Sequence, residues 1–112
     1  MRSLLPVFVL FVACLASAQN LLVARVTALA SGKILLNGKE TTIYSLSSEF
    51  EHLKAKGGEV WYYRENAQSE PHPQAMEVIK LVVRNNLPIS MSSKPDFSDY
   101  VDGNGYSYPR KP

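Results

Sequence analysis

Apolar and polar positions alternate over residues 22–29, the period-two pattern typical of a strand with one buried face. Two shorter strands are predicted at 33–36 and 39–43, separated by Asn37 and Gly38. This residue pair tolerates the positive φ angles of a two-residue type I′ turn, so the two segments are expected to form a hairpin. The side chains expected on the buried face of the first strand are Leu22, Ala24, Val26 and Ala28.

A change to helical spacing follows between Ser45 and Lys56, where Leu46, Phe50 and Leu53 lie on one stripe. The beginning of this helix has two candidates. Ser45 is a suitable N-cap, while Ser48 with Glu51 three residues later has the pattern of a capping box. Gly57 and Gly58 are expected to end the helix, because glycine readily adopts the left-handed conformation common at helix C-termini.

The second half of the chain repeats the order of strand, helix and strand. Residues 59–64 are rich in β-forming side chains, with Val60 and Tyr62 expected on one face. A helix is predicted from Pro73 to about residue 86, and a final strand at 89–92. The predicted apolar stripe of this helix consists of Ala75, Met76, Ile79, Val82 and Val83.

These elements predict an α+β fold, a small two-layer sandwich with two helices on one face of a mixed four- to five-stranded sheet. The folded domain is expected over residues 19–93. Residues 94–112 are rich in Ser, Gly, Pro, Tyr and Asp without periodicity, and they are predicted to form a mostly irregular tail attached through Phe97. The strand at 39–43 or the one at 89–92 is expected at a sheet edge, where a second chain can pair with it.

The first 18 residues have the composition of a signal peptide: a basic start, an apolar run from Leu4 to Ala18, and small residues before the expected cleavage site. The apolar run of 15 residues is shorter than the roughly 20 that span a bilayer, so a permanent membrane span is not expected. The alternative is a lipid anchor at Cys14, because residues 11–14 loosely resemble a lipobox. Either route predicts an exported protein, periplasmic or secreted.

Cleavage after Ala18 also removes Cys14, the only cysteine, so the mature chain has neither a disulfide nor a thiolate ligand for a metal. Loss of Arg2 reduces the 12 basic side chains to 11 against 10 acidic ones, a net charge of +1. Such a weak charge, in an exported protein, argues against a nucleic-acid partner.

No pattern of residues identifies a reaction, and no catalytic residue, cofactor or metal ligand is predicted. His52 and His72 are the only histidines, and they fall in different elements. Asp102-Gly103-Asn104-Gly105 resembles the centre of a calcium loop, but Tyr100 and Lys111 occupy positions that need acidic ligands. A polar turn is therefore the better interpretation of this segment. The serines lie in no motif of a nucleophilic enzyme, which favours a non-enzymatic protein.

Trp61, Tyr63 and Arg64 form the candidate interaction surface, since the two aromatic side chains are expected on the sheet face opposite the helices. Three arrangements remain open for that face. Tyrosines of the tail (Tyr100, Tyr106 and Tyr108) cover it, a second copy of the chain packs on it, or a ligand such as a sugar stacks on it.

The order of elements resembles the periplasmic domain of the ExbD/TolR family over residues 22–93. The resemblance is carried by GKILLNGKE at 32–40, GEVWYYREN at 58–66, and a helix followed by NNLPISMSS at 85–93. It implies a small α+β domain outside the cytoplasmic membrane. Family members typically dimerise, and the TolR branch is associated with the cell wall.

The N-terminal segment departs from that family. Its motor proteins carry an aspartate within a transmembrane helix, whereas residues 4–18 of this chain contain no carboxylate. The resemblance therefore implies the domain but not the transport activity. We expect an interaction or dimerisation domain with a homodimeric or envelope-protein partner. The alternatives are a module that binds peptidoglycan and a lipid-tethered accessory subunit.

Overall fold

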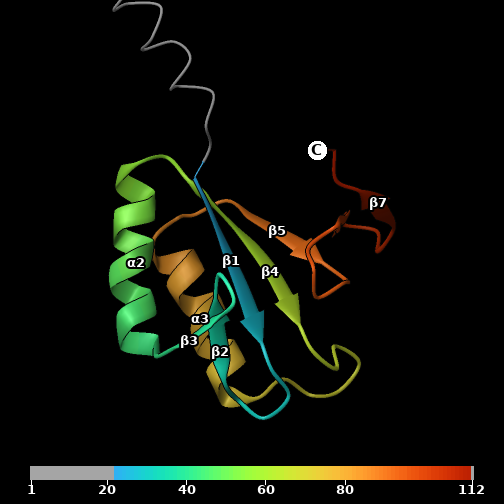
Figure 1. Cartoon of the computed structure of the whole chain (residues 1–112), viewed down its shortest axis with the longest axis horizontal. Coiled ribbons are helices and arrows are strands. Elements are labelled where there is room, and N and C mark those ends of the chain that lie inside the picture. Colours follow the sequence, from blue (N-terminus) through green and yellow to red (C-terminus); the bar gives the residue numbers. More distant parts are fainter. Residues whose placement is uncertain (1–21, 112) are drawn as a thin grey trace, which may run out of the picture.

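The computed structural model describes residues 22–111 of the 112-residue chain, so the predicted signal peptide and Cys14 lie outside the described residues. Two helices cover one face of a seven-stranded mixed sheet, with strand order β3-β2-β1-β4-β5-β6-β7 (Figure 1). This arrangement confirms the predicted α+β class. The sheet has more strands than the four to five expected, because the chain after residue 93 adds two.

Three parallel strands form the centre of the sheet. β1 (Val23–Ala28) pairs with β4 (Glu59–Arg64), and β4 pairs with β5 (Ile89–Ser92). The helices follow β3 and β4 in the chain and lie in the connections between these parallel strands, as parallel pairing requires. Successive side chains of β4 alternate as expected. Val60 and Tyr62 are buried beneath the helices, and Trp61 and Tyr63 lie on the opposite face, which we call the outer face.

The hairpin predicted from Asn37 and Gly38 is present between β2 (Ile34–Leu36) and β3 (Lys39–Thr41). Asn37 has φ 52° and Gly38 has φ 86°, the two positive angles that a type I′ turn requires. β3 lies at one edge of the sheet. It is shorter than predicted, because the chain enters a helix at Ile43.

Helix α2 (Ile43–Ala55) begins before both predicted caps. Its N-cap is Thr42, whose Oγ1 accepts a hydrogen bond of 3.1 Å from the backbone N–H of Ser45. Neither Ser45 nor Ser48 is the cap, because Thr42 already supplies a side-chain oxygen at the point where β3 ends. The predicted stripe is confirmed, since Leu46, Phe50 and Leu53 are buried. Gly57, with φ 71°, follows the helix as expected.

Helix α3 (Pro73–Arg84) begins as predicted but ends earlier, and its buried face is rotated from the expected one. Val78 and Leu81 are buried, whereas Met76 and Val83 are 47% and 68% exposed. Apolar residues recur at helical spacing on both the predicted stripe and the observed one. Contact with α2 along one side of α3 favours the observed stripe. The residues buried on α3 are Ala75, Val78, Leu81 and Val82.

His72 is the N-cap of α3, and its Nδ1 accepts a hydrogen bond of 3.1 Å from the backbone N–H of Gln74. We expect His72→Ala to lower the free energy of unfolding by about 1 kcal/mol, because the helix loses its side-chain acceptor. His72→Asn keeps an acceptor and is expected to lose less. Chemical denaturation of both variants measures the difference, and equal losses would contradict a capping role.

The segment 94–112 is not the irregular tail that its composition predicts. It contains β6 (Asp99–Val101) and β7 (Ser107–Pro109), which form a ribbon that extends the sheet beyond β5. The expected edge at residues 89–92 is therefore paired, and β7 is the second edge of the sheet. Phe97 is buried, which confirms the predicted attachment point.

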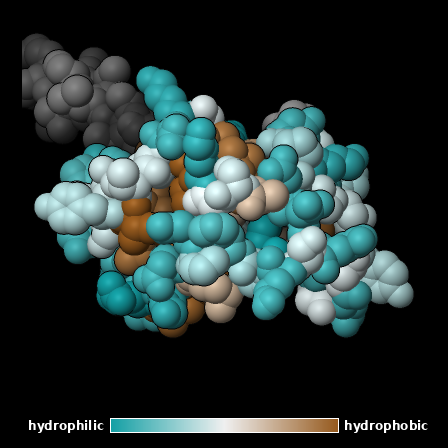
Figure 2. Space-filling model, turned by 90° about the horizontal axis from the view of Figure 1, so that it is seen from below, coloured by the Kyte–Doolittle hydropathy of each residue, from teal (hydrophilic) through white to brown (hydrophobic). Residues whose placement is uncertain are grey.

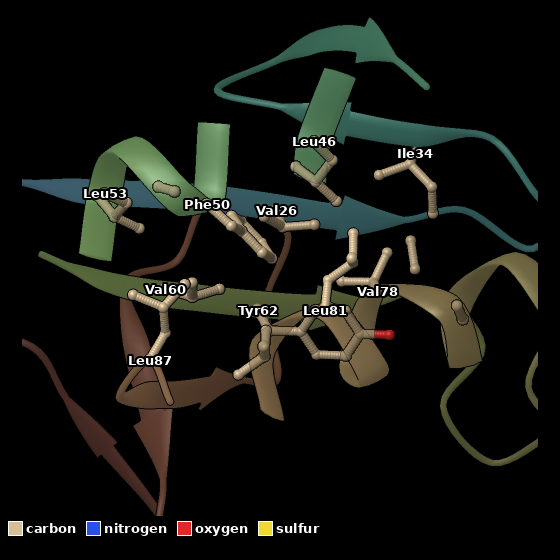
Figure 3. Close-up of a cluster of buried hydrophobic side chains, with 14 residues drawn as sticks. Val26, Ile34, Leu46, Phe50, Leu53, Val60, Tyr62, Val78, Leu81 and Leu87 are labelled. Carbon is tan, nitrogen blue, oxygen red and sulfur yellow. The ribbon is translucent and has the colours of Figure 1, made fainter. Parts of the chain in front are cut away.

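The hydrophobic core lies between the helices and the inner face of the sheet. Its largest fully buried side chains are Leu46 and Phe50 of α2, Val78 of α3, Val26 of β1 and Val60 of β4 (Figure 3). The buried side chains that form this cluster lie between residues 24 and 87. The described residues therefore form a single hydrophobic core.

Candidate functional site

Trp61 lies under two arginine side chains on the outer face of the sheet. The guanidinium carbon of Arg110 is 3.9 Å from the indole centroid, and that of Arg25 is 4.9 Å from it. The indole Nε1 donates a hydrogen bond of 2.6 Å to Glu59 Oε2. Guanidinium groups at these distances are attracted by the ring electrons. The Trp61 side chain therefore already has both cation–π and hydrogen-bond partners within the chain.

Arg110 brings the end of the chain onto Trp61 through several hydrogen bonds. Its Nε donates to the carbonyl oxygen of Phe97 at 3.0 Å, and its Nη2 donates to Ser92 Oγ at 3.0 Å. Burial lowers the pKa of this guanidinium, and the nearby carboxylates of Asp99 and Glu59 oppose that effect. The arginine thus fastens the tail to β5 and to the aromatic ring of β4.

Tyr63 lies beside a shallow groove of the outer face, with a volume of about 390 Å³. The groove is bordered by Thr27 and Leu35 of the sheet and by Pro95 and Phe97 of the returning tail. Tyr63 is half-buried there. The tail therefore covers part of the outer face at Tyr63 as well as at Trp61.

Arg64 differs from the other two predicted surface residues, because its side chain supports a loop. Its Nη1 donates to the carbonyl oxygen of Ser69 at 3.0 Å, and its Nη2 donates to that of Ala67 at 2.7 Å. These bonds shape the connection from β4 to α3. The structure thus places Trp61 and Tyr63 on one surface and directs Arg64 into the loop.

The tail covers Trp61 with an arginine and not with the tyrosines considered from the sequence. Tyr100, Tyr106 and Tyr108 remain 39%, 64% and 42% exposed. The rings of Tyr100 and Tyr108, paired across β6 and β7, have centroids 5.5 Å apart and are tilted by 31°. The β6–β7 ribbon therefore carries three exposed aromatic side chains.

Asp99 anchors that ribbon from a buried position, with only 2% of its surface exposed. Its carboxylate accepts hydrogen bonds from the backbone N–H of Ser93 at 3.0 Å, from Ser93 Oγ, and from Ser107 Oγ at 2.7 Å. Burial alone would raise the pKa of this carboxyl group, but the bonds from Ser93 and Ser107 outweigh it and lower the pKa. Asp99 thus joins the end of β5 to β7 as an ionised group.

The segment predicted as a polar turn connects β6 and β7. Asp102 Oδ1 accepts hydrogen bonds from the backbone N–H groups of Asn104 at 2.9 Å and Tyr106 at 3.0 Å. The bond from Tyr106 is the main cause of a lowered pKa for the Asp102 carboxyl group. The turn interpretation is therefore confirmed, with the carboxylate bonded to its own loop.

The remaining titratable candidates do not come together. His72 caps the beginning of α3, whereas His52 lies in the last turn of α2, at the opposite end of the helix pair. Within residues 22–111, no group of three or more His, Cys, Asp or Glu side chains is placed to hold a metal ion. The same residues contain no helix long and apolar enough to cross a membrane.

No protein-family model and no curated protein sequence matches this chain.

Sequence reasoning missed Arg25 and Arg110 at the outer face and Asp99 in the ribbon. Arg25 follows from the alternation of β1 and its pairing opposite Trp61. Asp99 and Arg110 required recognition of the hairpin in the tail. The signal for it was present, because a run of Asp, Gly and Asn residues between β-forming tyrosines is typical of a hairpin turn.

Proposed function

We propose that this chain is an exported, non-enzymatic protein-interaction domain of an envelope complex, and that Tyr100, Tyr106 and Tyr108 form its contact surface. The observation that carries the proposal is the exposure of these three tyrosines on a short ribbon at the edge of the sheet. Tyrosine is enriched at protein interfaces, because its ring contributes apolar area and its hydroxyl a hydrogen bond. The proposed partner is a second copy of the chain or another envelope protein.

A relation to the ExbD/TolR periplasmic domain is part of this proposal. The order of β1, the β2–β3 hairpin, α2, β4, α3 and β5 supports it, since the resemblance covers this part of the chain. The β6–β7 ribbon lies beyond the resembling region. The proposed contact through the ribbon therefore does not follow from the resemblance to that family.

The edges of the sheet favour contact through side chains over addition of a further strand. β3 has three residues and carries Lys39 and Glu40, both exposed. β7 also has three residues and ends in Pro109, which lacks a backbone N–H. Short strands, charges and proline are features that hinder pairing between edges. The exposed ring surface of the ribbon is the more suitable contact.

Light scattering and crosslinking test this proposal. We expect the wild-type protein to be dimeric or crosslinked to an envelope partner, and the triple substitution Tyr100→Ser, Tyr106→Ser and Tyr108→Ser to abolish that association. Tyr44→Ser is the matched control, because Tyr44 is 87% exposed on α2, away from the ribbon. A monomeric wild-type protein without a crosslinked partner, or equal effects of both variants, would reject the proposal.

Binding to peptidoglycan is the second candidate function, favoured by the adjacent rings of Tyr100 and Tyr108. Two neighbouring aromatic faces offer a surface on which sugar rings can stack. Sedimentation with purified peptidoglycan is expected to depend on these tyrosines and much less on Trp61, whose ring already contacts Arg110. Retention of the triple variant on peptidoglycan would exclude this role for the ribbon.

A further inference from the structure

Five elements of the domain meet at one end, which we call the entry end. β1, β4 and β5 begin there and both helices finish there, at the top left of Figure 1. The carbonyl oxygen of Leu22 accepts a hydrogen bond of 2.9 Å from the N–H of Glu59, and that of Pro88 accepts one of 2.9 Å from Val60. A Cβ on Gly58 would lie 2.7 Å from the Leu22 oxygen, so the turn after α2 packs closely against the start of β1.

Three exposed apolar side chains lie at the entry end. Leu22 precedes β1 and is 45% exposed, Val83 in the last turn of α3 is 68% exposed, and Ile89 at the start of β5 is 37% exposed. The opposite end also carries exposed apolar side chains, Tyr44 at 87% and Met76 at 47%, and apolar patches are visible among the hydrophilic side chains there (Figure 2). The entry end offers three apolar side chains, and the basic side chains beside them are what favour an anionic surface.

Basic side chains lie at the same end as these apolar ones, together with the acidic Glu49, which lines one hollow with Leu22 and Lys56. Lys54 and Lys56 lie at the end of α2, and Arg84 is the last residue of α3; all three are exposed. Glu59 also begins its strand here, but its carboxylate accepts the hydrogen bond from Trp61 on the outer face. Basic residues at helix C-termini also stabilise the helices themselves. That effect gives no reason for the exposure of Val83 and Ile89 beside them.

The chain reaches the entry end from its most hydrophobic segment. Residues 4–18 are almost wholly apolar, and the chain joins the described domain at Leu22, which opens β1. Whether that segment engages a membrane as a signal sequence or as a lipidated anchor, the entry end is the part of the domain that follows it. A membrane surface is thus close to this end while the segment is attached.

We propose that the entry end rests on an anionic phospholipid membrane, with Leu22, Val83 and Ile89 in the interfacial layer and Lys54, Lys56 and Arg84 near the lipid phosphates. Apolar side chains combined with basic ones are the composition that binds such a surface. The ribbon with its exposed tyrosines is a separate part of the domain. This orientation therefore holds independently of the partner proposed above.

Vesicle sedimentation of the chain from Gln19 onward, which contains the whole described fold, tests the basic part of the surface. We expect binding to vesicles of phosphatidylglycerol and phosphatidylcholine, and loss of binding in pure phosphatidylcholine or high salt. Replacing Lys54, Lys56 and Arg84 with glutamine is expected to weaken binding about 100-fold, or about fivefold for each charge.

The control variant replaces Lys33, Lys80 and Lys94 with glutamine. It has the same net charge, but these residues lie in the β1–β2 loop, in the middle of α3 and after β5. We expect it to lose much less affinity than the entry-end variant. Equal losses would overturn the proposal, because binding would then follow net charge alone. Absence of wild-type binding to the anionic vesicles would overturn it as well.

A second pair of variants tests the apolar part. Val83→Asp places a carboxylate at the entry end and is expected to weaken vesicle binding about tenfold or more. Tyr44→Asp changes charge equally at an 87% exposed position at the beginning of α2 and is expected to bind much as the wild type does. Similar binding of these two variants would show that Val83 does not touch the membrane, and would also overturn the proposal.

Discussion

Phe50→Ala is expected to lower the free energy of unfolding by about 3–5 kcal/mol. Phe50 is completely buried between α2 and the inner face of the sheet, so its removal loses apolar burial and leaves a cavity in the centre of the core (Figure 3). A domain of this size has a total stability of roughly 5–13 kcal/mol. The substitution therefore consumes a large part of the stability.

Urea denaturation followed by circular dichroism measures the Phe50→Ala effect. Tyr44→Ala is the control on the same helix, because the Tyr44 side chain is 87% exposed and its loss is expected to be small. A loss below about 1 kcal/mol for Phe50→Ala would mean that the site collapses to fill the space. It would also contradict the packing described for α2.

Asp99→Asn is expected to lower the free energy of unfolding by about 1–3 kcal/mol at neutral pH, because a buried, ionised acceptor loses part of its hydrogen bonding. Asp99 joins β5 to β7 through Ser93 and Ser107. The loss is expected to reach Trp61, since Arg110 follows β7 directly. Denaturation monitored by tryptophan fluorescence measures both the stability and the environment of Trp61.

The dependence of the unfolding free energy on pH is a second way to test the role of Asp99. The folded-state pKa of Asp99 is lowered, so its contribution is fully present above the ordinary carboxyl pKa of about 3.9 and disappears as the pH falls through the lower folded value. Asp96 and Asp102 also have lowered pKa values, chiefly through hydrogen bonds from Ser98 and Tyr106. Asp99→Asn is therefore expected to reduce the acid destabilisation of the wild type without abolishing it. If Asp99→Asn lost as much stability at acid pH as the wild type does, the contribution assigned to the Asp99 carboxylate would be contradicted.

The centre of the fold follows from sequence patterns because local signals and burial agree there. β1 and β4 alternate cleanly, and the Asn37-Gly38 turn has no good competitor. The start of α2 was missed because Thr42, Ser45 and Ser48 all have capping side chains, and only the end of β3 selects Thr42. The predicted buried face of α3 differs from the observed one, because apolar residues occupy more than half of the circumference of this helix.

The tail was misjudged for a different physical reason. Its strands are held by polar and aromatic contacts with distant residues, such as Asp99 with Ser93 and Arg110 with Trp61, and an apolar alternation is not needed for them. Composition therefore predicted an irregular segment. The candidate surface changed with it, because the ribbon covers Trp61 and presents its own tyrosines to solvent.

The order of strands in the sheet also has a consequence for how the domain is held together. The ribbon follows the core elements in sequence and joins β5 at one side of the sheet. The hydrophobic core of the described residues contains no side chain of β6 or β7, so the helices and strands β1 to β5 can pack without them. Removal of the ribbon by a protease acting near residue 94 would leave that core in place, converting Trp61 from a covered side chain into a newly exposed one.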